Sequence, residues 1–302
     1  MPSDEPGDGP VPPGYAAGAP VPWWLKFAVK LALGALPVPP RIWRELGLRR
    51  HSFFADDEAA LVAPLQAWAA QAAAVLGRPA RSLLELGPAA MVLRAPVAAA
   101  LGFAPIWYLD VEDDAPRSLE PYRRAAAAAR AAGLSPPDLS GCATREEVLR
   151  ACGARLLIGG TERLADIPAA SVDLVASSAV LEHVRRDEVG PLLVALREVT
   201  APDGVGLHGI DLHDHLGGRL RHLGFSPGFW EGTAVARAGL YCNRLGLSEF
   251  LDLMRSAGFR SRAITRLVWP AAPLPRSGTH PQLHRRAADN RICAATVECR
   301  PA

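Results

Sequence analysis

Hydrophobic positions along this chain follow two patterns that predict different secondary structures. Short apolar runs predict buried strands, and longer stretches with apolar residues three or four positions apart predict amphipathic helices. The predicted strands are 82–86, 106–109, 155–158, 172–176, 205–210, 261–269 and, as an edge strand, 292–298. The predicted helices are 56–76, 91–101, 119–132, 146–152, 188–199 and 248–257. This alternation predicts an α/β fold, a parallel sheet with helices on both faces.

The residues before the first predicted strand divide into a tail and an apolar segment. Residues 1–21 are rich in Pro, Gly and Ala, which predicts a disordered tail. Residues 23–33 are apolar apart from Lys26 and Lys30, which share one face of a helix. The segment is shorter than the ~20 residues that span a bilayer. Two interpretations stay open: the helix docks on its own domain or on a partner subunit, as in a homodimer, or it lies on a membrane surface.

Composition narrows the class of protein. The chain has 302 residues, 49% of them hydrophobic, which is enough to bury a sizeable core. Lys and Arg number 33 against 31 for Asp and Glu, so no general charge draws the chain to nucleic acid. The five cysteines form no Cys-x-x-Cys pair, which favours a reducing compartment. We therefore expect a cytoplasmic protein, peripheral at the inner membrane face if the apolar segment meets lipid.

Polar and small residues follow three of the predicted strands. Gly87 comes after the first strand, Asp110 ends the second, and Ser177 follows the fourth. The carboxyl ends of parallel strands meet at one edge of a sheet, where ligands of such folds bind. A glycine there lets the backbone approach a ligand closely, and an acid accepts hydrogen bonds from ribose hydroxyls. The pattern predicts a nucleotide-type cofactor site.

Four motifs resemble those of class I S-adenosylmethionine (SAM)-dependent methyltransferases, and most closely a type 11-like subgroup often linked to glycan or secondary-metabolite biosynthesis. They are Leu-Glu-Leu-Gly-Pro-Ala-Ala at 84–90, Val-Leu-Glu-His-Val at 180–184, Asp-Leu-His-Asp-His at 211–215 and Tyr-Cys-Asn-Arg at 241–244. The resemblance extends over about residues 43–269. It implies a Rossmann-like fold with a mostly parallel seven-stranded sheet.

The resemblance also implies a domain organisation. We expect a disordered tail at 1–21, a helical extension at 22–76 and a methyltransferase domain at 77–302. Residues 212–245 interrupt the strand and helix pattern with Gly, Pro and aromatic residues, so they are expected to form a lid insertion after the fifth strand.

The cofactor implied by the resemblance is SAM. The residues expected to bind it are Glu85, Gly87, Ala89, Asp110, Thr161, Glu162 and Ser177. The first motif departs from the family, because Ala89 replaces a second glycine and no acid follows it. Alanine adopts this turn either with a negative φ or at a cost of about 1 kcal/mol. Two interpretations follow: a retained site that binds SAM more weakly, or a site that has lost SAM.

The candidate catalytic residues are His183, Asp211 and His215. An imidazole with a pKa near 6.5 takes a proton from an attacking hydroxyl, so His183 is either a general base or a structural histidine. In an extended chain Asp211, His213 and His215 point one way, because side chains alternate along a strand. They fit three roles: deprotonating a substrate, binding a divalent metal, or lining a solvent-facing loop. We favour the first role and expect no metal.

The acceptor is expected to contact a further set of side chains from the insertion and the motif after it. These are His213, Arg221, Trp230, Asn243 and Arg244. Aromatic and basic residues together suit a sugar or an anionic acceptor, and they equally suit the packing of a lid. We expect O-methylation of a glycan or other small-molecule hydroxyl. The competing hypothesis is a catalytically silent relative that binds a partner protein or a membrane.

Overall fold

The computed structural model describes residues 7–11, 22–36 and 58–302. Internal contacts divide the chain into two compact units. Unit 1 comprises Met1–Trp43, Ala179–Leu193 and His208–Glu298, and unit 2 comprises Arg44–Ser178, Val194–Leu207 and Cys299–Ala302. Each unit is described by itself.

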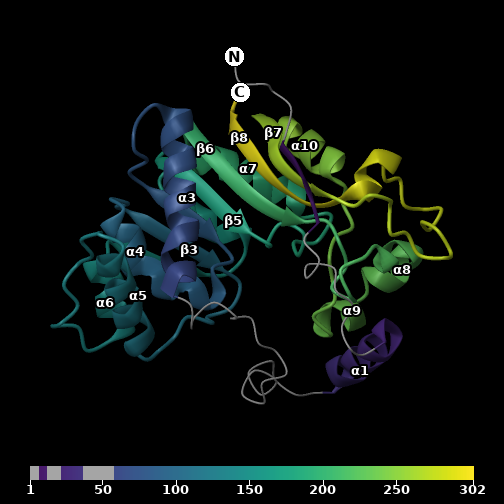
Figure 1. Cartoon of the computed structure of the whole chain (residues 1–302), viewed down its shortest axis with the longest axis horizontal. Coiled ribbons are helices and arrows are strands. Elements are labelled where there is room, and N and C mark those ends of the chain that lie inside the picture. Colours follow the sequence, from purple (N-terminus) through teal and green to yellow (C-terminus); the bar gives the residue numbers. More distant parts are fainter. Residues whose placement is uncertain (1–6, 12–21, 37–57) are drawn as a thin grey trace. The chain divides into compact units, whose positions relative to one another are not determined.

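Eight strands form a mixed sheet in the order β1-β7-β8-β6-β5-β2-β3-β4 (Figure 1). They are β1 (Gly7–Pro10), β2 (Leu83–Leu86), β3 (Ile106–Asp110), β4 (Ala154–Ile158), β5 (Val172–Ser178), β6 (Thr200–Asp211), β7 (Phe259–Val268) and β8 (Ile292–Pro301). The α/β class is confirmed. The predicted count of seven strands is not confirmed, because the sheet contains an eighth strand, and it also contains an antiparallel pair.

Unit 2 contains the parallel part of the sheet that bears on the predicted cofactor site. Leu86 of β2 lies opposite Leu109 of β3 on one side and Ser177 of β5 on the other. Asp110 of β3 lies opposite Ile158 of β4. The carboxyl ends of these four strands are therefore in register, and the loops that follow them leave from one edge of the sheet.

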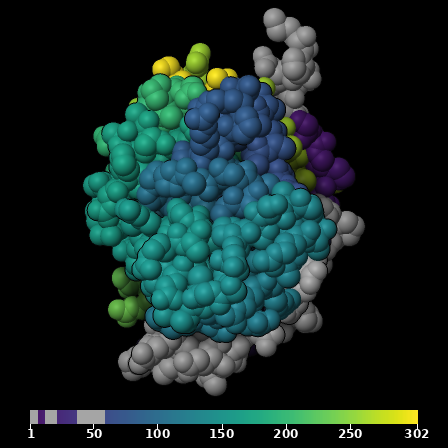
Figure 2. Space-filling model, turned by 90° about the vertical axis from the view of Figure 1, so that its left-hand side faces the viewer, coloured from purple at the N-terminus to yellow at the C-terminus, as the bar shows by residue number. Residues whose placement is uncertain are grey.

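Helices of unit 2 bury the apolar faces predicted from their spacing. They are α3 (Glu58–Leu76), α4 (Ala95–Ala100), α5 (Glu120–Ala131) and α6 (Arg145–Ala151). The first three pack on one another and α6 packs on β4, and the residues from α3 to α6 form a continuous face in Figure 2. Thr144 and Glu147 form a capping box that sets the start of α6. The apolar window Ala59–Leu76 is long enough to cross a membrane, but its residues Leu61 and Leu65 lie buried in the core.

Unit 1 is built around β7, β8 and the helices beside them. These helices are α1 (Trp23–Ala35), α8 (Pro227–Trp230), α9 (Thr233–Arg237) and α10 (Leu247–Ser256). Strand β1 pairs parallel with β7, and α10 packs on β7. Trp269 donates its N–H to Arg291, and Arg262 pairs with Glu298. Because position numbers rise along one strand as they fall along the other, β7 and β8 run antiparallel.

Several local predictions need correction. Gly7–Pro10 forms an edge strand within the predicted disordered tail, because its backbone pairs with β7 and its Asp8 pairs with Arg266. Strand β8 lies between β7 and β6, so it is not an edge strand. Residues 181–184 form a turn and a bend, and the helix predicted at 188–199 is α7 (Val189–Val199). The predicted helix start at Asp56 lies outside the described residues. The lid at 212–245 stays a prediction.

Candidate functional site

The turn after β2 has the backbone conformation that a glycine favours. Gly87 has a φ of 57° and Ala89 a φ of 47°. The left-handed region costs an alanine about 1 kcal/mol, so of the two conformations expected for Ala89 the chain adopts the strained one. Gly87 donates its N–H to Leu109 of β3 at 2.8 Å, and Ala89 donates its N–H to the Oδ2 atom of Asp110 at 2.8 Å. A charge-assisted hydrogen bond thus offsets the strain.

Asp110 organises the loops around it through both carboxylate oxygens. Its Oδ2 accepts the Ala89 N–H, and its Oδ1 accepts the Glu112 N–H at 3.3 Å. Its backbone carbonyl accepts the N–H of Gly159 in the loop after β4. The carboxylate is half-buried, and each oxygen has a second lone pair beyond the backbone bond. It can therefore still accept hydrogen bonds from two hydroxyls of a ligand.

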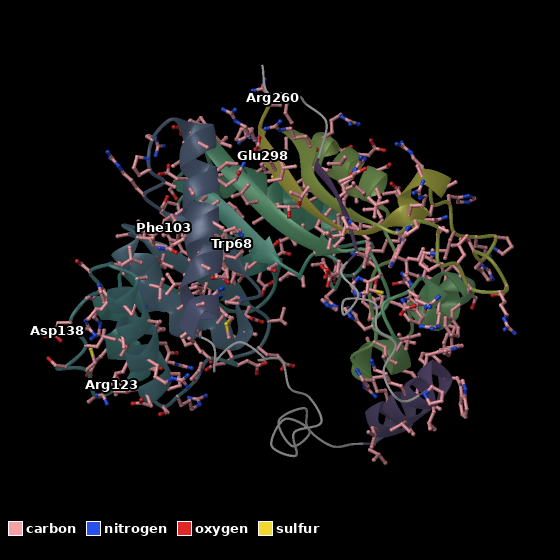
Figure 3. All side chains as sticks on the ribbon, in the orientation of Figure 1. Trp68, Phe103, Arg123, Asp138, Arg260 and Glu298 are labelled. Carbon is pink, nitrogen blue, oxygen red and sulfur yellow. The ribbon has the colours of Figure 1, made fainter. Side chains whose placement is uncertain are left out.

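Glu85 lies inside unit 2. Its Oε1 accepts a hydrogen bond from Arg94 at 2.6 Å, and both side chains are buried. Burial raises the pKa of Glu85, and the nearby Arg94 opposes that rise. The Arg94 guanidinium lies 5.8 Å from the ring centre of Trp68, which Figure 3 labels on α3. The Glu85 and Arg94 pair therefore ties β2 to the 3-10 segment that follows its turn. The contact of Glu85 with a cofactor stays a prediction.

The loop after β4 uses Glu162 to hold its own shape. Gly160 donates its N–H to Glu162 Oε1 at 2.8 Å. Hydrogen bonds from the backbone of Glu162 itself and then from Gly160 lower the pKa of the Glu162 carboxyl. Thr161 begins a short 3-10 helix, and Ser177 at the end of β5 is fully buried. Because β4 and β5 end in register with β2 and β3, the residues Thr161, Glu162 and Ser177 lie at the same edge of the sheet as Asp110.

In unit 1 the predicted catalytic histidines lie together. The His183 and His215 rings stack with centroids 4.9 Å apart, and His213 meets His215 at 6.0 Å. His183 is exposed, and its Nδ1 lies 3.0 Å from the Tyr241 carbonyl. A carbonyl only accepts, so Nδ1 of the neutral ring carries the proton and Nε2 carries the lone pair. This tautomer is assigned from the hydrogen bond.

His215 is a neutral imidazole. Burial, followed by the neighbouring His183 and His213, lowers its pKa to about 3. Its Nε2 has no hydrogen-bond partner among the described residues. Lys26 of α1 donates to the His215 carbonyl at 2.8 Å, which holds the loop in place.

Asp211 lies at the end of β6 beside the buried carboxyl of Glu182, a residue that the sequence did not single out. Asp211 donates its N–H to Oε1 of Glu182 at 3.3 Å, and Glu182 is 2% exposed. Burial and the Asp211 charge raise the pKa of Glu182 well above its ordinary value. The Leu-Glu-His run at 181–183 was the only sequence signal for Glu182. It did not indicate that the carboxylate is buried, because a charged residue beside a histidine is usually exposed.

Among the described residues, no group of three His, Cys, Asp or Glu side chains is arranged to hold a metal ion, so the metal alternative gains no support.

A second missed residue, Asp214, shapes the loop that follows. Its side chain is fully buried and accepts the backbone N–H groups of Leu216, Arg219 and Arg221. One carboxylate thus satisfies three backbone N–H groups between the end of β6 and the first residue of the 3-10 helix Arg221–Gly224. Arg221 points its guanidinium over the Trp23 ring of α1, with 5.4 Å to the ring centre.

Three predicted acceptor contacts lie inside unit 1 and have protein partners. Asn243 donates to the Leu181 and Val184 carbonyls and is 1% exposed. Trp230 is fully buried and donates to the Cys242 carbonyl at 2.8 Å. Arg244 donates to the Phe225 carbonyl and pairs with Glu231. Asn243 thus braces the turn that carries Glu182 and His183, whereas Trp230 and Arg244 hold the chain around Cys242, Phe225 and Glu231. The predicted contact of Asn243, Trp230 and Arg244 with an acceptor stays a prediction.

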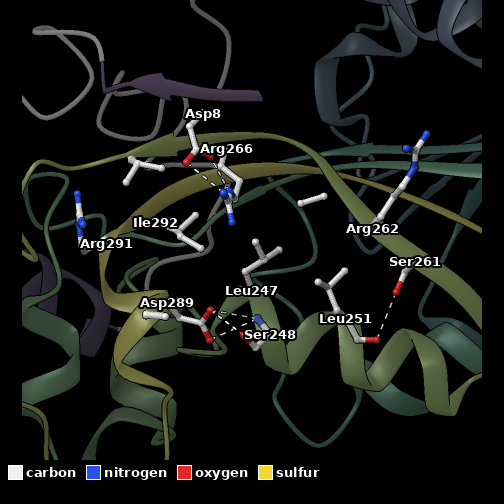
Figure 4. Close-up of a pocket in the computed structure, with 13 residues that line it drawn as sticks. Asp8, Leu247, Ser248, Leu251, Ser261, Arg262, Arg266, Asp289, Arg291 and Ile292 are labelled. Atoms are coloured by element: carbon white, nitrogen blue, oxygen red, sulfur yellow. Dashed lines mark hydrogen bonds and ion pairs between the residues drawn. The ribbon is translucent and has the colours of Figure 1, made fainter. Parts of the chain in front are cut away.

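A cleft of about 560 Å³ lies elsewhere in unit 1, between β7 and α10 (Figure 4). Its walls combine leucines of α10 with charged side chains of β1, β7 and the segment before β8. Asp8 pairs with Arg266 on the adjacent strand, and Asp289 accepts hydrogen bonds from Ser248. None of the predicted site residues lines this cleft.

No protein-family model and no curated protein sequence matches the chain. Many solved structures are similar to it, among them the following three. The trans-methyltransferase CalH in complex with SAH is 14% identical with a TM-score of 0.41; the match covers 79% of this chain and 55% of CalH, so the chain spans about half of that protein. The N-terminal domain of EvdMO1 with SAH bound is 18% identical, with 82% and 85% covered and a TM-score of 0.43. A SAM-dependent methyltransferase from Mesorhizobium loti is 17% identical, with 82% and 99% covered and a TM-score of 0.42. At these values none of them assigns a function to this chain.

Proposed function

We propose that this protein is a SAM-dependent methyltransferase that transfers the methyl group to a hydroxyl of a glycan or other small molecule. The observation that carries the proposal is the bond between the Ala89 N–H and the Asp110 carboxylate at 2.8 Å. It joins a positive-φ turn to an acid at the aligned carboxyl ends of parallel strands, which is the arrangement that suits a nucleoside ligand.

The residues at this edge fit the proposed cofactor. Asp110 is half-buried and retains lone pairs for the two ribose hydroxyls, and the Gly87 turn presents backbone without a bulky side chain. When bound, SAM supplies a methyl group on a positively charged sulfur. The chain's own contribution is orientation of the reactants and removal of a proton.

His183 is the residue we propose to remove that proton. Its Nδ1 faces the Tyr241 carbonyl, so the lone pair of the neutral ring is on Nε2, the nitrogen that accepts a proton. His215 stacks against it and is kept neutral by burial, which lowers the pKa of His215 to about 3. In this proposal Asp211 and His215 help to position His183.

One observation favours the competing function, a relative that binds no SAM. Ala89 holds a φ of 47° where a glycine would be unstrained. If the strained turn does not bind the cofactor, Asp110 has a purely structural role, which is to accept the Ala89 and Glu112 N–H groups. The alternative predicts a stable fold without affinity for the cofactor product.

Titration calorimetry with S-adenosylhomocysteine (SAH) distinguishes the two functions. We expect micromolar binding by the natural chain, loss of binding in Asp110→Ala, and unchanged binding in Asp138→Ala. Asp138 is a suitable control because it is also a unit 2 aspartate, and its hydrogen bonds go to nearby Ser140. Absence of heat at millimolar SAH with the natural chain would overturn the methyltransferase proposal.

A further inference from the structure

Helix α1 has an uncovered apolar side. Trp24, Leu25, Val29 and Leu36, at its C-terminal cap, are 58%, 40%, 47% and 50% exposed. These four make up much of the exposed large apolar surface of the described residues, although the helix and its cap are only a short part of the chain. Single exposed leucines are ordinary, but a cluster on one helix marks an interaction surface.

The opposite side of α1 is firmly docked in unit 1. Trp23, Phe27 and Leu31, spaced four apart, pack on the core cluster that includes Trp230. The rings of Phe27 and Phe225 stack at 5.1 Å. A Cβ on Gly34 would come within 2.8 Å of the Ala238 backbone, so this glycine permits the close approach to α9. These contacts fix the rotation of α1, which lies beside α9 in Figure 1.

The two lysines of α1 are on the docked side. Lys26 donates to the His215 carbonyl, and Lys30 is close enough to His215 to lower its pKa. At about 100° per residue, the exposed positions from 24 to 36 fall within an arc of about 140°. That arc contains only Trp24, Leu25, Val29, Leu36 and three alanines, so it has no charge.

The described segments next to this apolar arc contain more basic than acidic residues. Helix α1 itself contains Lys26 and Lys30 and no acidic residue. Residues 215–240, which include α8 and α9, contain three arginines and a single acid, Glu231. That acid is already paired with Arg244 and accepts the Tyr241 hydroxyl. A second copy of the chain would bring two such cationic surfaces together, which charge repulsion opposes.

We propose that the outer face of α1 binds an anionic lipid bilayer surface, with the helix in the plane of the interface. An uncharged arc with a tryptophan at its edge suits the boundary between headgroups and acyl chains. The excess of basic over acidic residues in α1 and in residues 215–240 attracts anionic headgroups over the ~10 Å that salt leaves unscreened. With 13 residues, α1 lies on the surface and does not span the bilayer. This inference does not rest on the proposed methyl transfer.

Sedimentation with vesicles tests it on the full chain. Vesicles of equal parts phosphatidylcholine and phosphatidylglycerol are expected to bind the protein, and vesicles of pure phosphatidylcholine to bind it more weakly. Val29→Glu places a charge on the arc without touching the docked side, and it should lower partitioning by about tenfold or more. Leu274→Glu is the matched control, because Leu274 is a 41% exposed leucine outside α1, and it should bind as the natural chain does.

Several outcomes overturn the proposal. Failure of the natural chain to bind phosphatidylglycerol vesicles does so directly, and equal loss in Val29→Glu and Leu274→Glu would show that α1 has no special part. Analytical ultracentrifugation tests whether a second copy of the chain covers the arc instead. If the natural chain self-associates, Val29→Glu abolishes this, and vesicles do not bind, the arc is a contact between two copies. Matching unfolding temperatures of the natural chain and Val29→Glu exclude a folding defect, and Val29→Ser provides an uncharged second variant.

Discussion

The candidate cofactor edge of unit 2 and the histidine cluster of unit 1 use their carboxylates in opposite ways. Asp110 accepts two backbone N–H groups and still reaches solvent. Glu182 accepts one N–H, is 2% exposed, and has an Oε2 atom with no hydrogen-bond partner among the described residues. The first arrangement suits recognition of a polar ligand. In the second arrangement burial disfavours the ionised form of Glu182, and such perturbed carboxyls are common where proteins transfer protons.

The largest expected effect tests the chemistry assigned to unit 1. His183→Gln removes the proposed base but keeps a side chain of similar reach, so the methyl-transfer rate should fall by about 10²–10⁴-fold. SAH affinity should stay unchanged, because the proposed cofactor residues belong to unit 2. Once an acceptor hydroxyl is known, single-turnover rates and calorimetry on the same variant measure both. A rate that does not fall would remove His183 from the mechanism.

The pH dependence of stability probes the buried side of the same cluster. His215 has a pKa of about 3 when folded and about 6.5 when unfolded, so below about pH 6.5 the unfolded state binds more protons. The natural chain should therefore lose stability as the pH falls from about 6.5 towards 3, by up to about 3 kcal/mol near pH 4. His215→Asn should lose less over that window. Urea unfolding at several pH values gives the comparison, and parallel curves would contradict the assignment.

An intermediate effect separates the two regions by ligand affinity. Asp110→Asn keeps one oxygen for the Ala89 N–H but loses the charge, so SAH should bind about 10–100-fold more weakly. Asp211→Asn makes the same exchange in unit 1 and should leave SAH affinity within about twofold. Calorimetric dissociation constants of both variants decide the matter. Equal losses would mean that the division of roles between the two regions is wrong.

The smallest effect concerns the strain in the turn of unit 2. Ala89→Gly relieves a positive φ, and the gain in folding stability should be at most about 1 kcal/mol, reduced by the greater freedom of glycine in the unfolded chain. Thermal unfolding detects this, with Ala100→Gly in α4 as a control that should destabilise. A large rise in SAH affinity in the same variant would show that the alanine weakens the natural site.

The Glu85 and Arg94 pair shows how far sequence reasoning reaches. The apolar run around Glu85 correctly predicts a buried strand, and the same run makes a charged residue within it look like part of a ligand site. Its partner Arg94 lies nine residues later, on the 3-10 segment before α4, and local pattern does not reveal that the two side chains meet. The backbone partners of Asn243 and Trp230 were equally invisible in the sequence, because the carbonyl groups that accept their hydrogen bonds are identified only by the fold.

The sequence by itself determined the elements whose signals are local. Periodicity placed the strands that carry Gly87, Asp110 and Ser177, because burial of alternating or continuous apolar residues depends on neighbours along the chain. Spacing likewise placed Lys26 and Lys30 on one face of α1. Only the tertiary structure decided which face that was. It also decided the pairing of β1 with β7, the inner position of β8 and the burial of Glu182, because contacts between distant residues depend on packing and partners that no local pattern contains.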